Sequence, residues 1–73
     1  MNYEKKFGAT MRKLRLKRGW SQEHLAEISG LHRTYISGVE RGVRNPTLSI
    51  IVQIATALGV PPAALLSERG DGE

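Results

Sequence analysis

The chain has 73 residues, which is the size of one small domain. The absence of cysteine excludes disulfides and thiolate zinc sites, and two histidines alone cannot complete a four-ligand metal site. No aliphatic stretch approaches the roughly 20 residues of a membrane helix, and no secretory signal is visible. We therefore expect a cytoplasmic protein without a cofactor. Because so small a domain has a limited core, oligomerisation is the remaining way to stabilise it.

The charge is distributed unevenly along the chain. Residues 1–48 carry ten lysines and arginines against four acidic residues, a net charge of +6. Residues 49–73 carry one arginine against three acidic residues, a net charge of −2. With an isoelectric point near 10.0, this asymmetry leaves two interpretations open. It indicates either a solvated basic surface or one side that binds an anionic partner such as a nucleic acid.

Helical periodicity dominates the sequence, and we predict an all-α fold, a compact bundle of five helices. The first helix is expected from Tyr3 to Arg18, ended by a glycine at position 19. Ser21 is expected to cap a second helix, which Gly30 ends. The apolar faces of these two helices are Phe7, Met11 and Leu14 in the first, and Leu25, Ala26 and Ile28 in the second.

Three further helices follow. The third is expected from His32 or Arg33 to Arg41, with two aliphatic side chains, at positions 36 and 39, facing inward. The fourth runs from Leu48 to Leu58 behind a threonine cap at position 47, and two prolines at 61 and 62 begin a short fifth helix. We expect residues 1–68 to form the single domain and residues 69–73 to be a disordered tail.

The segment from Ser21 to Gly42 predicts a helix-turn-helix, because two short helices meet at a tight turn around Gly30 and the small Ala26 permits a close crossing. The signal is weak alone, since many helical hairpins share it. The outward face of the third helix strengthens it, because its polar groups suit base edges and include no acid. An ordinary polar helix face is the alternative. The outward residues are Arg33, Thr34, Ser37, Gly38 and Arg41.

Four sequence runs, 18–26, 30–37, 40–42 and 44–46, resemble the lambda-repressor/Cro-type helix-turn-helix regulators in order and spacing. The resemblance spans residues 6–66. The short chain looks most like the controller proteins of restriction–modification systems, although small phage regulators and some antitoxins share the same motifs.

This resemblance implies roles for individual residues. Base-reading positions are matched by Arg33, Thr34 and Ser37. Gly38 departs from the pattern, because many relatives carry a longer side chain there. Positions assigned to the DNA backbone are Gln22, Tyr35, Arg41, Arg44 and Asn45, although packing alone explains Tyr35 equally well. Arg15 and Glu40 match a pair that ties the first helix to the end of the third.

The fourth helix is apolar over too wide an arc for a surface helix. Its expected core stripe is Leu48, Ile51, Val52, Ile54, Ala55 and Leu58, and two more apolar residues widen the arc to roughly 220°. We therefore predict a homodimer, with a fifth helix that covers the excess surface as the alternative. The predicted interface residues are Ile50, Ala57, Val60, Ala63 and Leu66.

Together these features predict a dimeric, sequence-specific DNA-binding transcriptional regulator that binds double-stranded DNA at an operator with two-fold symmetry. We expect no catalysis, because the sequence offers no credible Ser/His/Asp set, acid pair or metal cluster. An antitoxin that binds a toxin and regulates its own operon is the alternative. A tetramer on DNA, a contact with RNA polymerase, and activation against repression stay open at this stage.

Overall fold

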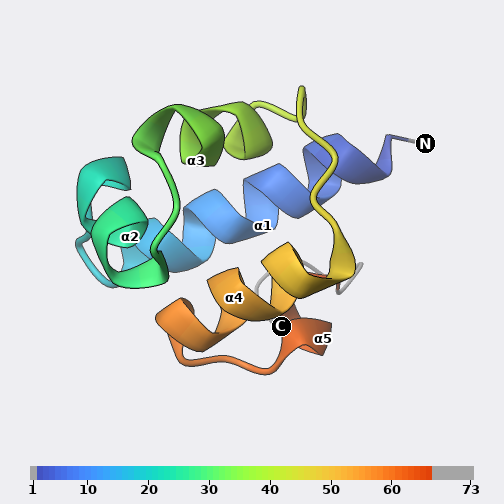
Figure 1. Cartoon of the computed structure of the whole chain (residues 1–73). Coiled ribbons are helices and arrows are strands. Elements are labelled where there is room, and N and C mark those ends of the chain that lie inside the picture. The colour runs from blue at the N-terminus through green and yellow to red at the C-terminus, as the bar shows by residue number, and fades with distance from the viewer. Residues whose placement is uncertain (1, 67–73) are drawn as a thin grey trace.

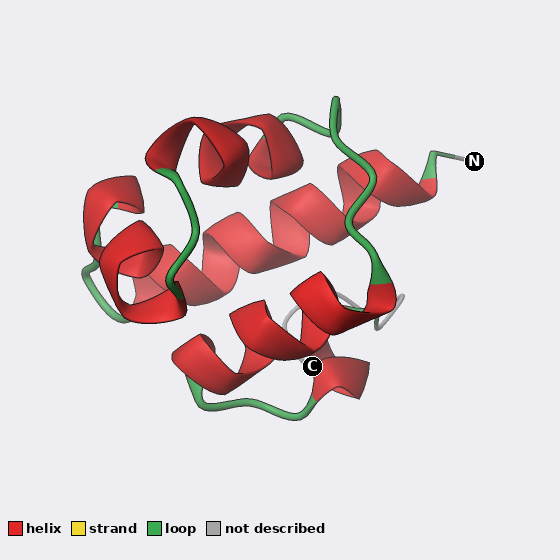
Figure 2. Ribbon diagram, in the orientation of Figure 1, coloured by secondary structure: helices red, strands yellow, loops and turns green. Residues whose placement is uncertain are grey.

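The structure, a computed structural model, describes residues 2–66 and contains five helices and no strand within that range (Figure 2). The helices are α1 (Tyr3–Lys17), α2 (Gln22–Ser29), α3 (Arg33–Glu40), α4 (Leu48–Leu58) and α5 (Pro62–Leu65). The predicted all-α fold of five helices is confirmed, and α1 and α3 each end one residue earlier than expected. The predicted tail, residues 69–73, lies outside the described residues, as do the last residues of the predicted domain.

The helices pack around α1, which crosses the molecule with α3 on one side and α4 and α5 on the other (Figure 1). α1 contacts α3 and α5, and α2 contacts α3 and α4. Every helix contributes to one hydrophobic core, which consists of Phe7, Met11, Leu14, Leu25, Ala26, Ile36, Val39, Ile54, Ala55, Leu58 and Leu65. None of the helices within residues 2–66 has the length and apolar character needed to cross a bilayer.

Local hydrogen bonds set the helix ends where the sequence placed them. The Ser21 hydroxyl accepts a hydrogen bond from the backbone N–H of His24 at 3.0 Å, and Thr47 does the same for Ile50 at 3.3 Å. Both residues therefore satisfy a free N–H in the first turn of a helix. The start of α3 differs, since its N-cap residue His32 makes no side-chain hydrogen bond there.

The turn between α2 and α3 is fixed by the end of α2 and by a contact from α4. Gly30 adopts a left-handed conformation with φ 79°, which favours glycine. Its N–H and that of Leu31 both donate to the carbonyl oxygen of Ala26, at 2.9 and 3.1 Å. The Gln53 side-chain amide on α4 donates to the Ser29 carbonyl at 2.7 Å. These bonds hold α3 at a defined angle to α2, as the predicted helix-turn-helix requires.

Three apolar residues that the sequence assigned to the interior are exposed. Ile28 is 44% exposed, while Ser29 is buried in its place, because α2 turns the face with Leu25 and Ala26 toward α3 and α4. On α4 the predicted stripe was too wide: Leu48 is 73% exposed and Val52 is 44% exposed. The buried face of α4 is confined to Ile54, Ala55 and Leu58, and no described element covers the flank beside it.

The backbones of α1 and α3 approach closely where the two helices cross at Gly8. A Cβ atom at this position would overlap the Val39 carbonyl oxygen and lie 2.6 Å from that of Glu40. We expect Gly8→Ala to lower the free energy of unfolding by at least about 2 kcal/mol, although alanine favours a helix over glycine by about 1 kcal/mol. Urea denaturation followed by Trp20 fluorescence measures the change.

The matched control is Ala9→Gly at the next, exposed position of α1. It should cost about 1 kcal/mol through helix propensity alone. If Gly8→Ala were as stable as the wild type, the close crossing would not constrain position 8.

Candidate nucleic-acid interface

The exposed face of α3 carries the residues that the sequence assigned to base reading. Arg33 and Thr34 are exposed, and Ser37 is half-buried. The Ser37 hydroxyl accepts a hydrogen bond from Nη1 of Arg41 at 2.9 Å, so these two side chains lie together one turn apart. Within the described residues, no hydrogen bond or ion pair engages the Arg33 side chain. The first turn of α3 therefore presents a guanidinium and a hydroxyl that are available to a ligand.

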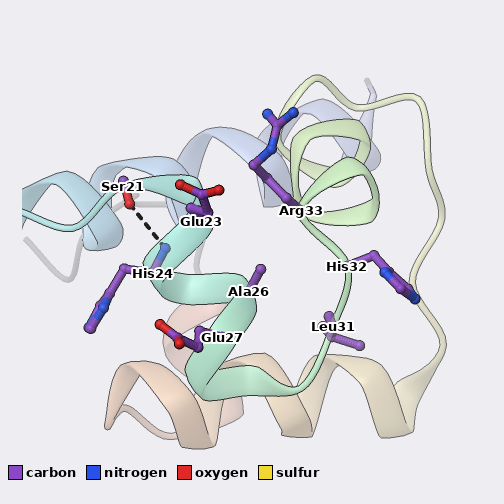
Figure 3. A pocket seen from close by; sticks show the side chains of 8 residues that line it. All are labelled: Ser21, Glu23, His24, Ala26, Glu27, Leu31, His32 and Arg33. Atoms are coloured by element: carbon purple, nitrogen blue, oxygen red, sulfur yellow. Dashed lines mark hydrogen bonds between the residues drawn. The ribbon is translucent and has the colours of Figure 1, made fainter.

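Arg33 also borders a hollow between α2 and the start of α3 (Figure 3). Ala26 also lines this hollow, although its side chain is almost fully buried in the core. Glu23 and Glu27 line the α2 side, and Arg33 projects from the other side (Figure 3). The acidic side chains thus lie on α2, separate from the α3 face that carries Thr34 and Ser37.

A buried ion pair lies behind this face. Glu40 Oε2 accepts from Nε of Arg15 at 2.7 Å, and Oε1 accepts from Nη2 at 3.0 Å. The side chains are only 7% and 2% exposed, for Arg15 and Glu40 respectively. Nη1 of Arg15 donates to the Trp20 carbonyl at 2.7 Å. The pair anticipated by the resemblance is therefore present, and it also fixes the turn between α1 and α2.

The Gln22 side chain is held in place and is not free at the surface. Its Nε2 donates to Glu40 Oε1 at 3.0 Å, so the same carboxylate also holds the first residue of α2. The side chain is half-buried rather than extended into solvent. No sequence pattern signals this link, because positions 22 and 40 are far apart along the chain.

The loop after α3 packs against that helix. The Val43 N–H donates to the Gly38 carbonyl at 3.0 Å, and Cζ of Arg44 lies 5.7 Å from the centre of the Tyr35 ring. Gly38 was expected to be open on the outward face but is buried, because the Arg44 side chain covers it. Asn45 is exposed. The structure thus brings Tyr35 and Arg44 together, on the flank of α3 where Tyr35 lines a hollow with Ile50.

The residues predicted for a dimer interface differ in their exposure and in the hollows that they line. Ile50 lines a small apolar hollow with Tyr35 and the α2–α3 turn. Leu66 lines a different groove, with Tyr3 and Ile51. Partial burial against the core is shared by Ile50, Ala57 and Val60, whereas Ala63 and Leu66 are exposed.

Two short helices at a fixed angle, with a polar and basic outer face on the second, define a helix-turn-helix protein. Residues 11–65 match the helix-turn-helix family model. The chain belongs to the helix-turn-helix family. The resemblance to lambda-repressor/Cro-type regulators and to controller proteins is therefore confirmed.

Among its relatives, control protein C.SmaI of Serratia marcescens is 58% identical over 50 residues. That match covers 68% of this chain and 60% of the relative, so it spans less than two thirds of that protein. The crystal structure of the restriction–modification controller protein C.AhdI from Aeromonas hydrophila has a TM-score of 0.83 and 52% identity, covering 85% of this chain and 94% of that one. The controller protein C.Esp1396I, as a tetramer with its natural 35 base-pair operator, has a TM-score of 0.82 and 38% identity, covering 89% and 86%.

The buried ion pair makes a testable contribution to stability. We expect Glu40→Ala to lower the free energy of unfolding by about 3–5 kcal/mol, because it leaves the Arg15 guanidinium buried without a carboxylate. Urea denaturation measures this loss. The control is Glu27→Ala on the exposed side of α2, which should change stability by less than about 0.5 kcal/mol. Equal stability of the two variants would contradict a role for the pair in holding α1 to α3.

Proposed function

We propose that this chain is a sequence-specific DNA-binding transcriptional regulator, the controller protein of a restriction–modification operon, acting in the cytoplasm. The observation that carries the proposal is the exposed face of α3, where Arg33 and Thr34 are unobstructed. An arginine can donate two hydrogen bonds to guanine, and a threonine can contact several base edges or a thymine methyl group. The relatives described above favour this function over the antitoxin alternative.

Base reading requires that the protein docks on DNA in a fixed position, which phosphate contacts can set. Residues beside the α3 face are candidates for these contacts. Arg41, Arg44 and Asn45 are exposed beside the α3 face and are our candidates for phosphate contacts. Gln22 stands at the N-terminus of α2, where free backbone N–H groups favour an anion. Its Nε2 has a second hydrogen beyond the one given to Glu40. We therefore assign it a phosphate contact alongside its structural bond.

The regulator acts as a homodimer in this proposal, so that two α3 helices meet successive major-groove faces about 34–36 Å apart. The uncovered apolar flank of α4 supports a second copy as the partner. Leu48 and Val52 are neighbours one turn apart on that flank, and Ile51 beside them lines the groove that contains Leu66. We propose that Leu48 and Val52 contribute to this interface together with Leu66, since all three are exposed in the monomer.

Footprinting on the DNA upstream of its own gene tests the proposed function. A protected region with two-fold related half-sites is expected. The length of the protected region distinguishes a bound dimer from a bound tetramer, which is the assembly of C.Esp1396I on its natural operator. The absence of any protected sequence in the operon would contradict the proposal.

The base-reading assignment predicts a change in selectivity. Arg33→Ala should lower operator affinity by about 1–3 kcal/mol and relax the preference at one base position in each half-site. A binding-site selection with randomised DNA measures that preference. The control is Lys13→Ala on the exposed side of α1, which should leave the selected sequence unchanged. Wild-type selectivity in Arg33→Ala would show that this arginine does not read a base.

The dimer assignment predicts a change in assembly. Leu66→Glu should raise the dissociation constant of the dimer at least about tenfold, because it places a charge in an interface that loses water. In the monomer the same side chain is 58% exposed, so folding should be unaffected. Sedimentation equilibrium compares it with Leu16→Glu, since Leu16 is 50% exposed on α1. Dimers of unchanged affinity in Leu66→Glu would exclude this face.

A further inference from the structure

Gly38 lies inside α3, where glycine is unfavourable. Nothing in the helix itself requires a glycine at this position. Its backbone is helical, and alanine stabilises a helix interior relative to glycine. It lies one turn after Thr34, on the same face of α3. The structure nevertheless buries it, whereas Thr34 is exposed. The atoms that cover Gly38 therefore lie on the proposed DNA-binding face.

The covering group is the side chain of Arg44. A Cβ atom at position 38 would lie 2.7 Å from Cγ of Arg44, 3.4 Å from its Nε and 3.6 Å from its Cδ. The first of these distances is shorter than real Cβ contacts, so any side chain at 38 would displace the stem of Arg44. The Arg44 stem thus occupies the space that a side chain at position 38 would fill.

Two further contacts fix this arrangement. The Val43 N–H donates to the Gly38 carbonyl at 3.0 Å, which closes the end of α3 and fixes the residue before Arg44 at its last turn. At the other end, Cζ of Arg44 lies 5.7 Å from the centre of the Tyr35 ring, within the range of a cation–π contact. Tyr35 and Gly38 are three residues apart and therefore neighbours on the helix surface. The arginine is held at its stem by Gly38 and at its guanidinium by Tyr35.

We propose that Gly38 is a positioning residue, which together with Tyr35 forms a seat that holds Arg44 along the α3 face in the orientation that meets DNA. The proposal rests on the proposed function. Because the side chain is ordered before DNA arrives, less conformational entropy is lost on binding than for a free arginine. Arg44 also extends the basic surface of α3 to a position where the helix has no side chain of its own.

A double-mutant cycle tests the seat. Gly38→Ala should melt at the same temperature as the wild type or higher, because alanine favours the helix. Its affinity for the footprinted operator should nevertheless fall by about fivefold to tenfold, as should that of Arg44→Ala. In the Arg44→Ala background, adding Gly38→Ala should change the affinity by less than about twofold, because the seat is then empty. Fluorescence anisotropy with labelled operator DNA and thermal denaturation provide the two readouts.

The salt dependence of binding gives a second readout that a purely structural role would not move. Arg44→Ala should lower the slope of log affinity against log salt by about one unit, the effect of one lost phosphate contact. Gly38→Ala should lower the slope in the same direction, although it removes no charge. An unchanged slope in Gly38→Ala would overturn the proposal.

The outcomes separate this inference from the proposed function. If the wild type protects no operator, the proposed function fails. If it does bind, a full additional loss from Gly38→Ala in the Arg44→Ala background overturns the seat, because the added methyl group would then obstruct DNA directly.

The seat can also be examined without DNA. The NMR signals of the Arg44 side chain should show the ring-current shift of Tyr35 in the wild type and lose it in Gly38→Ala, and identical signals would contradict the proposal.

Discussion

The arrangement of the first three helices depends on the hydrogen bonds that the Glu40 carboxylate accepts. It accepts two hydrogen bonds from Arg15 on α1 and one from Gln22 on α2, and it stands at the last residue of α3. A buried carboxylate is costly unless its lone pairs are satisfied. No buried side-chain nitrogen or oxygen within residues 2–66 lacks a partner. The three helices can therefore meet only where these donors converge, and that geometry sets the orientation of α3.

The close crossing at Gly8 acts together with this carboxylate. A glycine on α1 lets the backbone of α3 approach at Val39 and Glu40, next to the position where Arg15 reaches the same carboxylate. A short contact between backbones and a bidentate ion pair both resist sliding of one helix along the other. The outer face of α3 is consequently presented by a rigid support, which is a requirement for reading base edges at fixed spacing.

Because the helices are held in fixed positions, two different kinds of exposed surface lie on separate parts of the domain. The α3 side carries charge and hydrogen-bonding groups at Arg33, Thr34 and Arg44, whereas α4 leaves apolar side chains at Leu48 and Val52 without cover. Apolar surface of this sort on so small a domain marks an interaction site. In the proposed function, the basic α3 face binds DNA while the separate apolar flank of α4 dimerises, because the two proposed surfaces share no residue.

The five helices, their caps and the helix-turn-helix were predictable from the amino-acid sequence, because these features depend on neighbours within a few residues. The signals were a serine before α2, a threonine before α4, and glycines after both. The sequence also placed Arg33 and Thr34 on the outer face of α3, since one helix wheel suffices for that. Which flank of α4 stays uncovered could be seen only in the folded chain, because that depends on where α2 and α5 pack against it. The tertiary structure alone showed that Gln22 bonds Glu40 and that Arg44 covers Gly38, because these residues meet through folding and no periodic pattern connects them.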